Sequence, residues 1–184
     1  MKRIFLTLAG ISALFLILAI VLGLNVGDPA VRDTAVQKRI GTHMLAGMGA
    51  LAFATLVHAI SFTYFMGTGR WIEETSQAYS LEDSFFQRSQ KLKYGILPWI
   101  TFCVLMMVTT GALGAVADPA TPASLDGLLG MSSSQIHFTC AVTTAILNLL
   151  TNFSQFLAIS ANSRVVEEVL SHVRRIRLER GLPV

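Results

Sequence analysis

Four long apolar runs alternate with shorter polar stretches along the 184-residue chain. Because a helix needs about 20 apolar residues to cross the hydrocarbon core of a bilayer, each run is long enough to span a membrane. None contains Asp, Glu, Lys or Arg. The pattern therefore predicts an all-α, integral membrane, four-helix up-down bundle in one domain over 1–184. The predicted spanning helices cover about 4–24, 42–66, 96–117 and 136–161.

Two polar stretches are also predicted to be helical, over about 67–95 and 162–180. Residues Ser80–Asp83 resemble a capping box that opens a charged helix, and the glycines at 67 and 69 are expected to end one. The second stretch keeps an apolar stripe that needs a cover, either the 67–95 segment or a partner subunit. The stripe consists of Val166, Val169, Leu170, Val173 and Ile176.

Positive charge lies unevenly on the two sides of the predicted bundle. With the N-terminus, 67–95 and the C-terminus on one side, that side holds 11 Lys and Arg residues and the other holds 3. The positive-inside rule then places both termini in the cytoplasm of a multi-pass protein of the cell membrane. Lys2 and Arg3 before the first run are also compatible with a signal peptide, but the run is long and lacks an A-x-A site, which favours a retained anchor.

Composition supports a membrane protein and excludes other classes. Apolar residues make up 53% of the chain, charged residues 14%, and the mean hydropathy is +0.60. The net charge of +3 forms no basic stripe interleaved with aromatics, so no nucleic-acid partner is expected. Cys103 and Cys140 fall at different predicted depths, too far apart for a disulfide, and are expected to be small buried residues.

A faint repeat with an offset of 94 residues relates the two halves of the chain. It matches His43 with His137, and its best stretch aligns 70–74 with 164–168. A duplicated two-helix hairpin explains the match, and chance similarity between apolar segments is the alternative.

Histidines are the ionisable groups inside the apolar runs, where such groups are functional candidates. His43 and His137 open the second and fourth helices at their outer ends. His58 lies 15 residues after His43, which is about 22 Å along a helix and close to the same face. That face carries Gly47, Ala50 and Ala54, and the matching face of the fourth helix carries Ala141, Thr144, Asn148 and Asn152.

Two neutral imidazoles at one depth suit the axial positions of a haem iron. A porphyrin also needs small neighbours, which Gly47 and Gly49 on the second helix and Gly111, Ala112 and Gly114 on the third supply. The haem propionates would meet Arg39 and its neighbours Arg32, Lys38 and Thr42.

This arrangement resembles the haem-binding four-helix bundle of the cytochrome b family. In that family, two histidines on the second helix, separated by 13 or 14 residues, pair with two on the fourth. Here His43 and His58 match on the second helix, His137 matches on the fourth, and Asn152 stands in place of the second histidine. The resemblance implies one b-type haem between His43 and His137, and an inner site that is lost or altered.

Other interpretations of the same residues remain open. Small residues also serve ordinary helix packing in membranes, and Asn148 and Asn152 are candidates for hydrogen bonds with His58, Asn152 above all because it lies at the same depth. Asp118 and Asp126 are candidates to join His43 and His137 around zinc or copper, and a proton-relay role of the histidines is a further alternative.

Two functions follow as expectations, and neither makes the chain a catalyst on its own. The first is a small electron-transfer subunit of a redox complex that carries haem b and exchanges electrons with quinone or with a redox protein at the outer face. The second is a cofactor-free anchor or scaffold that binds other membrane subunits through the C-terminal helix. A transporter is disfavoured because no predicted helix is broken at the midplane.

Overall fold

The structure, a computed structural model, describes residues 1–27 and 33–183, and it is built from four long helices. The described residues contain no strand. A short 3₁₀ turn, η1 (Leu128–Gly130), lies between the third and fourth helices. All four long helices are long and apolar enough to cross a membrane, which supports a multi-pass membrane protein. They are α1 (Lys2–Leu24), α2 (Thr34–Tyr79), α3 (Ser84–Val116) and α4 (Ser133–Glu179).

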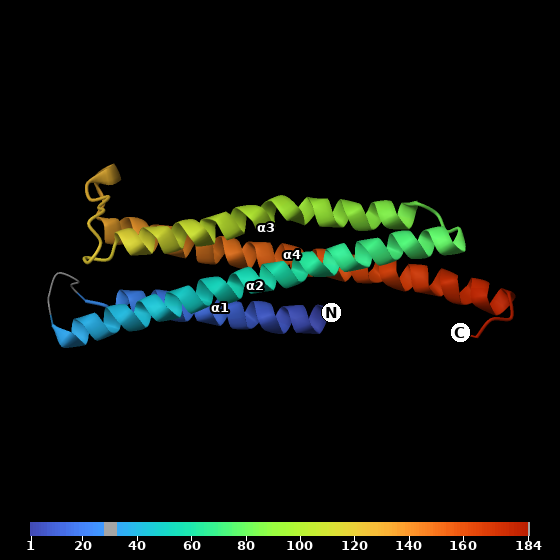
Figure 1. Cartoon of the computed structure of the whole chain (residues 1–184), viewed down its shortest axis with the longest axis horizontal. Coiled ribbons are helices and arrows are strands. Elements are labelled where there is room, and N and C mark those ends of the chain that lie inside the picture. The colour runs from blue at the N-terminus through green and yellow to red at the C-terminus, as the bar shows by residue number, and fades with distance from the viewer. Residues whose placement is uncertain (28–32, 184) are drawn as a thin grey trace.

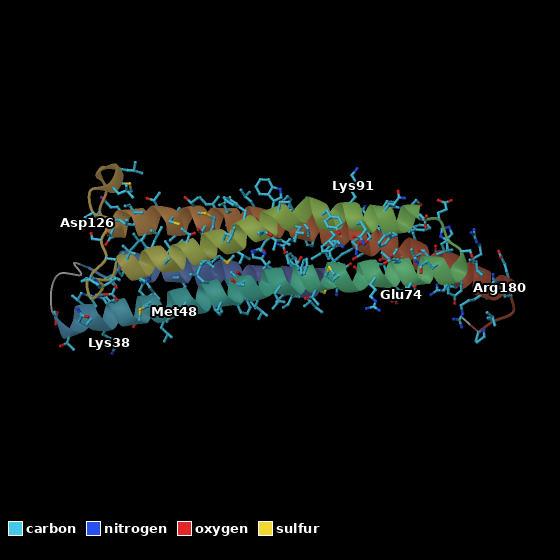
Figure 2. The ribbon with its side chains drawn as sticks, turned by 45° about the horizontal axis from the view of Figure 1, so that its top comes forward. Lys38, Met48, Glu74, Lys91, Asp126 and Arg180 are labelled. Carbon is cyan, nitrogen blue, oxygen red and sulfur yellow. The ribbon has the colours of Figure 1, made fainter. Side chains whose placement is uncertain are left out.

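The helices alternate in direction, so the bundle is up-down (Figure 1). The hairpins α1–α2 and α3–α4 pack side by side, and α2 and α4 also meet each other across the bundle. We call the end that carries the connections after α1 and α3 the loop end. Figure 2 shows Lys38 and Asp126 at this end and Arg180 at the opposite one.

The three later helices continue well beyond α1, whose N-terminus lies about halfway along the molecule (Figure 1). This part, residues 67–79, 84–95 and 162–179, is called the extension below. Each of its three helical segments continues a spanning helix without a break. The predicted helical stretches at 67–95 and 162–180 are thus confirmed as helix, although the first is two helices joined by a turn.

Small residues let the helices approach closely near the loop end. Ala19, Ala50 and Ala54 are buried there together with Leu16, Cys103 and Met107. Larger side chains fill the next part of the core toward the extension, where Phe5, Val57, Phe65 and Ile159 are buried. α1 therefore contributes to both core clusters, as an element of the bundle.

The helix ends differ in part from the sequence predictions. The predicted capping box at Ser80–Asp83 is wrong: Ser80 takes a left-handed conformation that ends α2, and Asp83 makes no side-chain cap. A capping box does form at the start of α4, between Ser132 and Gln135. The prediction that 67–69 ends a helix is also wrong, because α2 runs through both glycines; tertiary packing overrides their low helix propensity.

The extension covers three of the five residues of the apolar stripe on α4, namely Val166, Val169 and Val173. Val169 and Val165 are buried against Ile72 of α2 and Phe85 of α3. Val166 and Val173 pack at the edge of this cluster, whereas Leu170 is 47% exposed. The Arg88 guanidinium donates to both Glu168 carboxylate oxygens, at 2.5 and 3.0 Å, and so ties α3 to α4 beside the cluster. The 67–95 segment, the first of the two predicted covers, therefore covers part of the stripe, and Leu170 lies outside this cover.

Both cysteines are free, as predicted. Cys103 is buried, but Cys140 is only partly buried, close to the Thr110 hydroxyl.

Candidate functional site

The sequence-predicted histidine pair comes together at the loop end of the bundle. His43 lies in the first third of α2 and His137 in the second turn of α4. Their ring centroids are 6.1 Å apart, and the rings are inclined at 67° in an edge-to-face arrangement. Two metal–nitrogen bonds of about 2 Å, with each ring pointing away from the metal, also give a centroid separation of about 6 Å. The centroid separation is therefore compatible with one metal held between the two rings.

The His43 ring has a defined tautomer. Its Nδ1 lies 3.0 Å from the carbonyl oxygen of Ala19 on α1. A carbonyl can only accept, so Nδ1 carries the proton and Nε2 keeps its lone pair. A backbone carbonyl behind the imidazole is the usual second partner of a metal-bound histidine, because it fixes the ring and makes Nε2 more basic.

The His137 ring is less satisfied by the protein. Its Nδ1 is buried and has no hydrogen-bond partner among the described residues. Leaving a buried polar atom unpaired costs about 1–3 kcal/mol, and such atoms call for an explanation. No described residue therefore fixes the tautomer of His137 in the way that the Ala19 carbonyl fixes that of His43.

Each of the two histidines packs against a glycine on the preceding helix of its own hairpin. A Cβ atom added to Gly23 would lie 2.9 Å from Cε1 of His43, and one added to Gly114 would lie 3.0 Å from Cε1 of His137. The two halves of the bundle thus hold their histidines in the same way. Gly114 was predicted as room beside a porphyrin, but the structure shows that it makes room for the imidazole itself.

The other predicted glycines lie in more open surroundings. A Cβ added to Gly47 or Gly49 would meet nothing within 4 Å, and one added to Gly111 would meet only Leu51 Cδ1 at 3.6 Å. Gly111 is exposed at the surface of α3. Gly47 lies one helical turn after His43 and has free space beside it. It is therefore the predicted glycine that best fits the expected room beside a porphyrin.

The predicted propionate partners lie one turn before His43. Lys38, Arg39 and Thr42 line a hollow of about 300 Å³ at the loop end between α1 and α2, together with Leu22, Asn25 and Ala35. Arg32 lies outside the described residues. A hollow lined by two cationic side chains suits a carboxylate-bearing ligand.

The acidic residues considered for a zinc or copper site do not join the histidines. Among residues 1–27 and 33–183, no group of three or more His, Cys, Asp and Glu side chains is arranged to hold a metal ion. The Asp126 carboxylate instead accepts hydrogen bonds from the backbone N–H and hydroxyl of Ser133, at 2.7 and 2.9 Å, which lower its pKa. Asp118 accepts from the backbone N–H of Ala120.

His58 forms a different kind of site, nearer to the extension. It is 1% exposed, which confirms that it lies within the bundle. The prediction that Asn152 is its partner is wrong. Asn148 lies 3.2 Å from Nε2, Gln155 lies 2.6 Å from Nδ1, and Asn152 donates to Asn148 at 2.8 Å. The reason is helical spacing: Asn148 and Gln155 flank Asn152 by about one turn each and reach the two ring edges.

With the Asn148 and Asn152 amides oriented as in the structure, the hydrogen bonds of the His58 ring can be assigned. Asn148 accepts at Oδ1 from Asn152, so its NH₂ group donates to Nε2 of His58. Nδ1 must then be the protonated nitrogen and needs an acceptor. The Gln155 oxygen, which has no other partner, fills this role once its amide is turned by 180°. Both nitrogens of His58 are thereby used, and none remains for a metal.

Two further polar contacts lie on the same side of α4. Near the loop end, the hydroxyls of Thr110 and Thr144 lie 2.7 Å apart. At the boundary of the extension, Asn162 donates to Thr68 at 2.8 Å and to Tyr64 at 3.3 Å. Sequence reasoning missed Gln155 and Asn162, although both continue the 148–152 face at helical spacing and could have been found by extending it.

A shallow apolar groove of about 220 Å³ lies between α2 and α3. It is lined by Thr55, His58, Ala59, Phe62, Leu97, Ile100 and Val104.

Comparisons with known proteins give no relative from which a function can be carried over. No family model, no curated protein and no solved structure matches the chain.

Proposed function

We propose that this chain is a small membrane subunit that carries one b-type haem and transfers electrons near the loop end. The observation that carries the proposal is the pair His43 and His137, whose rings lie 6.1 Å apart on two different helices. The free Nε2 of His43 and the unpartnered Nδ1 of His137 show that the protein alone does not saturate this pair. The inner histidine is saturated and would take no haem.

The protein would tune the haem through groups that are already in place. When bound, the haem supplies a one-electron couple. The Ala19 carbonyl would hold the His43 ring and raise its basicity. Gly23 and Gly114 would keep both rings seated, because any larger residue would displace them. Lys38 and Arg39 would neutralise the two propionates in the cationic hollow.

The orientation and origin of the bundle belong to the same proposal. The excess of Lys and Arg on the side of the extension supports a cytoplasmic position for that side and for both termini. The haem would then lie near the outer face and exchange electrons with quinol in the bilayer or with a redox protein. Duplication of a two-helix hairpin would account for the matched histidines, and the contact of Asn162 with Thr68, also 94 residues apart, supports it.

Haem content tests the proposal. Protein purified from haem-competent cells is expected to contain one haem per chain, measured as extracted haem against protein. A His43→Ala/His137→Ala double variant is expected to lose it, whereas His172→Gln, on the extension, should keep it. A wild-type protein without haem would contradict the proposal.

A cofactor-free anchor subunit is the second candidate, and it rests on the far part of α4. Leu170 and Leu178 are exposed there although both are large apolar residues. An exposed apolar surface on a charged helix is typical of a subunit contact. Co-purification of a second subunit by the haem-free double variant, and its loss on Leu170→Asp/Leu178→Asp, would favour this function.

A further inference from the structure

The connection between α3 and α4 ends in a tip that is built around two exposed leucines. Leu128 is 51% exposed and Leu129 is 87% exposed. Leu129 has φ 56° and ψ 21°, in the left-handed region that side chains other than glycine rarely adopt. A large apolar side chain held outward in a strained conformation requires a reason beyond local packing.

The tip is a fixed structure with its own hydrogen bonds. The Gly127 N–H donates to the Met131 carbonyl at 2.9 Å, and the Met131 N–H donates back to Leu128 at 3.0 Å. The base of the tip is closed by Asp126, which accepts from the backbone and side chain of Ser133 at the start of α4. The leucines are therefore presented by a clamped loop.

The position of the tip indicates what it meets. The connection leaves α3 at Val116 and returns at Ser133, both at the ends of membrane-length helices. In both views η1 stands to one side of the bundle at the level of these helix ends and does not prolong the bundle along its axis (Figures 1 and 2). A loop at this level and to this side lies over the lipids that surround the bundle.

The chemistry of the connection suits a membrane boundary. Residues 117–132 contain no Lys or Arg, and of their two carboxylates Asp126 is held by Ser133. Apolar side chains are favoured in the interfacial region of a bilayer, because the free energy gained there is proportional to the apolar area removed from water.

We propose that the Leu128–Leu129 tip inserts into the lipid interface beside the loop end and anchors the α3–α4 connection to the bilayer. This inference does not depend on a bound haem or on which side of the membrane the loop end faces. The tip would fix the start of α4, and with it the second-turn residue His137, relative to the membrane surface.

Spin labels on the wild-type fold test the proposal. In a Cys103→Ala/Cys140→Ala background reconstituted in phosphatidylcholine vesicles, a nitroxide is attached at Leu129→Cys. The same label at Leu149→Cys, exposed in the middle of α4, gives the lipid reference, and at Ala123→Cys, exposed earlier in the same connection, the water reference. Collisions with oxygen and with a water-soluble nickel complex are measured by power saturation.

The Leu129 label is expected to resemble the Leu149 label, with more oxygen and fewer nickel collisions than Ala123. A label at Leu129 as open to nickel as the one at Ala123 would overturn the proposal, and would point to a soluble partner as the occupant. Should the cysteine-free background fail to fold, Leu129→Trp in a Trp71→Phe/Trp99→Phe chain provides the same comparison. Brominated lipids are then expected to quench its fluorescence, and an unquenched tip would overturn the proposal.

Discussion

Histidines lie at two levels between α2 and α4: the outer layer holds His43 and His137, and the inner layer holds His58. The surroundings of the two layers differ. At the loop end, His43 and His137 face each other, and the side chains around them leave ring nitrogens without a protein partner. At the inner layer, one histidine meets amides, and Asn148 and Gln155 occupy both of its nitrogens. The half-buried imidazoles are thus open to a ligand at the loop end, whereas the buried imidazole of His58 is part of the structure.

The difference shows that burial of a histidine does not by itself indicate a metal site. His58 is more deeply buried than either His43 or His137. Its partners are neutral amides that satisfy both donor and acceptor, so it specifies how α2 and α4 pair. What distinguishes the outer pair is the unmet hydrogen-bonding capacity of its rings.

The extension provides the largest expected effect, since it contains neither histidine layer and serves as a folding reference. Val169→Asp places a carboxylate in the fully buried cluster with Ile72 and Phe85. It is expected to cost about 3 kcal/mol or more, because a buried charge has no partner there. Thermal unfolding in detergent measures the loss. The neighbouring Leu170→Asp, at an exposed position, is the matched control, and equal losses for both would mean that the cluster is not packed as described.

The inner layer should be broken by removing one amide. Asn148→Leu leaves Nε2 of His58 and the NH₂ group of Asn152 without partners and is expected to cost about 1–3 kcal/mol. The spectrum of any haem should stay unchanged, because no ligand is touched. Leu149→Val, at an exposed position of the same turn, serves as the control for thermal stability. If Asn148→Leu changes the haem spectrum and Leu149→Val does not, the inner layer would take part in haem binding, which contradicts the account.

Substitution of Gly23 and Gly114 tests how the two histidines of the outer layer are held. Gly23→Ala and Gly114→Ala bring a methyl group to 2.9 and 3.0 Å from a ring carbon of His43 and His137. Each should displace its imidazole and lower haem content or shift the reduced band, at a stability cost of about 1–3 kcal/mol, as for overpacked sites. Gly10→Ala on α1 meets nothing within 4 Å and should do neither. Identical spectra for all three variants would show that the rings are not seated on these glycines.

The surface pair on the extension gives the smallest expected effect. Arg88→Gln should cost about 0.2–1 kcal/mol, because the pair with Glu168 is half exposed. The hydrogen bond from Arg88 lowers the pKa of Glu168, so the pair stabilises the fold above the ordinary carboxyl pKa of about 4.5. Its contribution is lost as the pH falls through the lowered pKa. Unfolding curves of wild type and Arg88→Gln should therefore converge in acid, and a constant difference at every pH would contradict the ion pair.

Much of this architecture could be predicted from apolar pattern and spacing. Four runs without charge indicated four helices, and the offset of 94 residues brought His43 and His137 to one depth, where the structure places them. Helix ends were harder, because Ser80 ends one helix in a left-handed conformation where the local sequence resembled the start of another. Capping preferences are small compared with tertiary packing.

The surroundings of the histidines could be predicted only in part. Gly23 was missed because the first run was interpreted as an anchor, and nothing local in 4–24 indicates that His43 packs on it. Gln155 was missed because the inner layer was expected to pair residues of equal depth, whereas long amide side chains reach one helical turn along the bundle. Both omissions concern contacts between side chains on different helices. Such contacts depend on rotamers and on the angle at which the helices cross, which the sequence does not give.

The central claim is that His43 and His137 hold a metal porphyrin and His58 does not, and the visible spectrum of the dithionite-reduced protein tests it most directly. The wild type is expected to show the sharp alpha band of a six-coordinate b-type haem. His43→Ala and His137→Ala should each abolish the band or convert it to a five-coordinate form, whereas His58→Ala should leave it in place. A colourless wild type from haem-competent cells, or a band lost only in His58→Ala, would contradict the account.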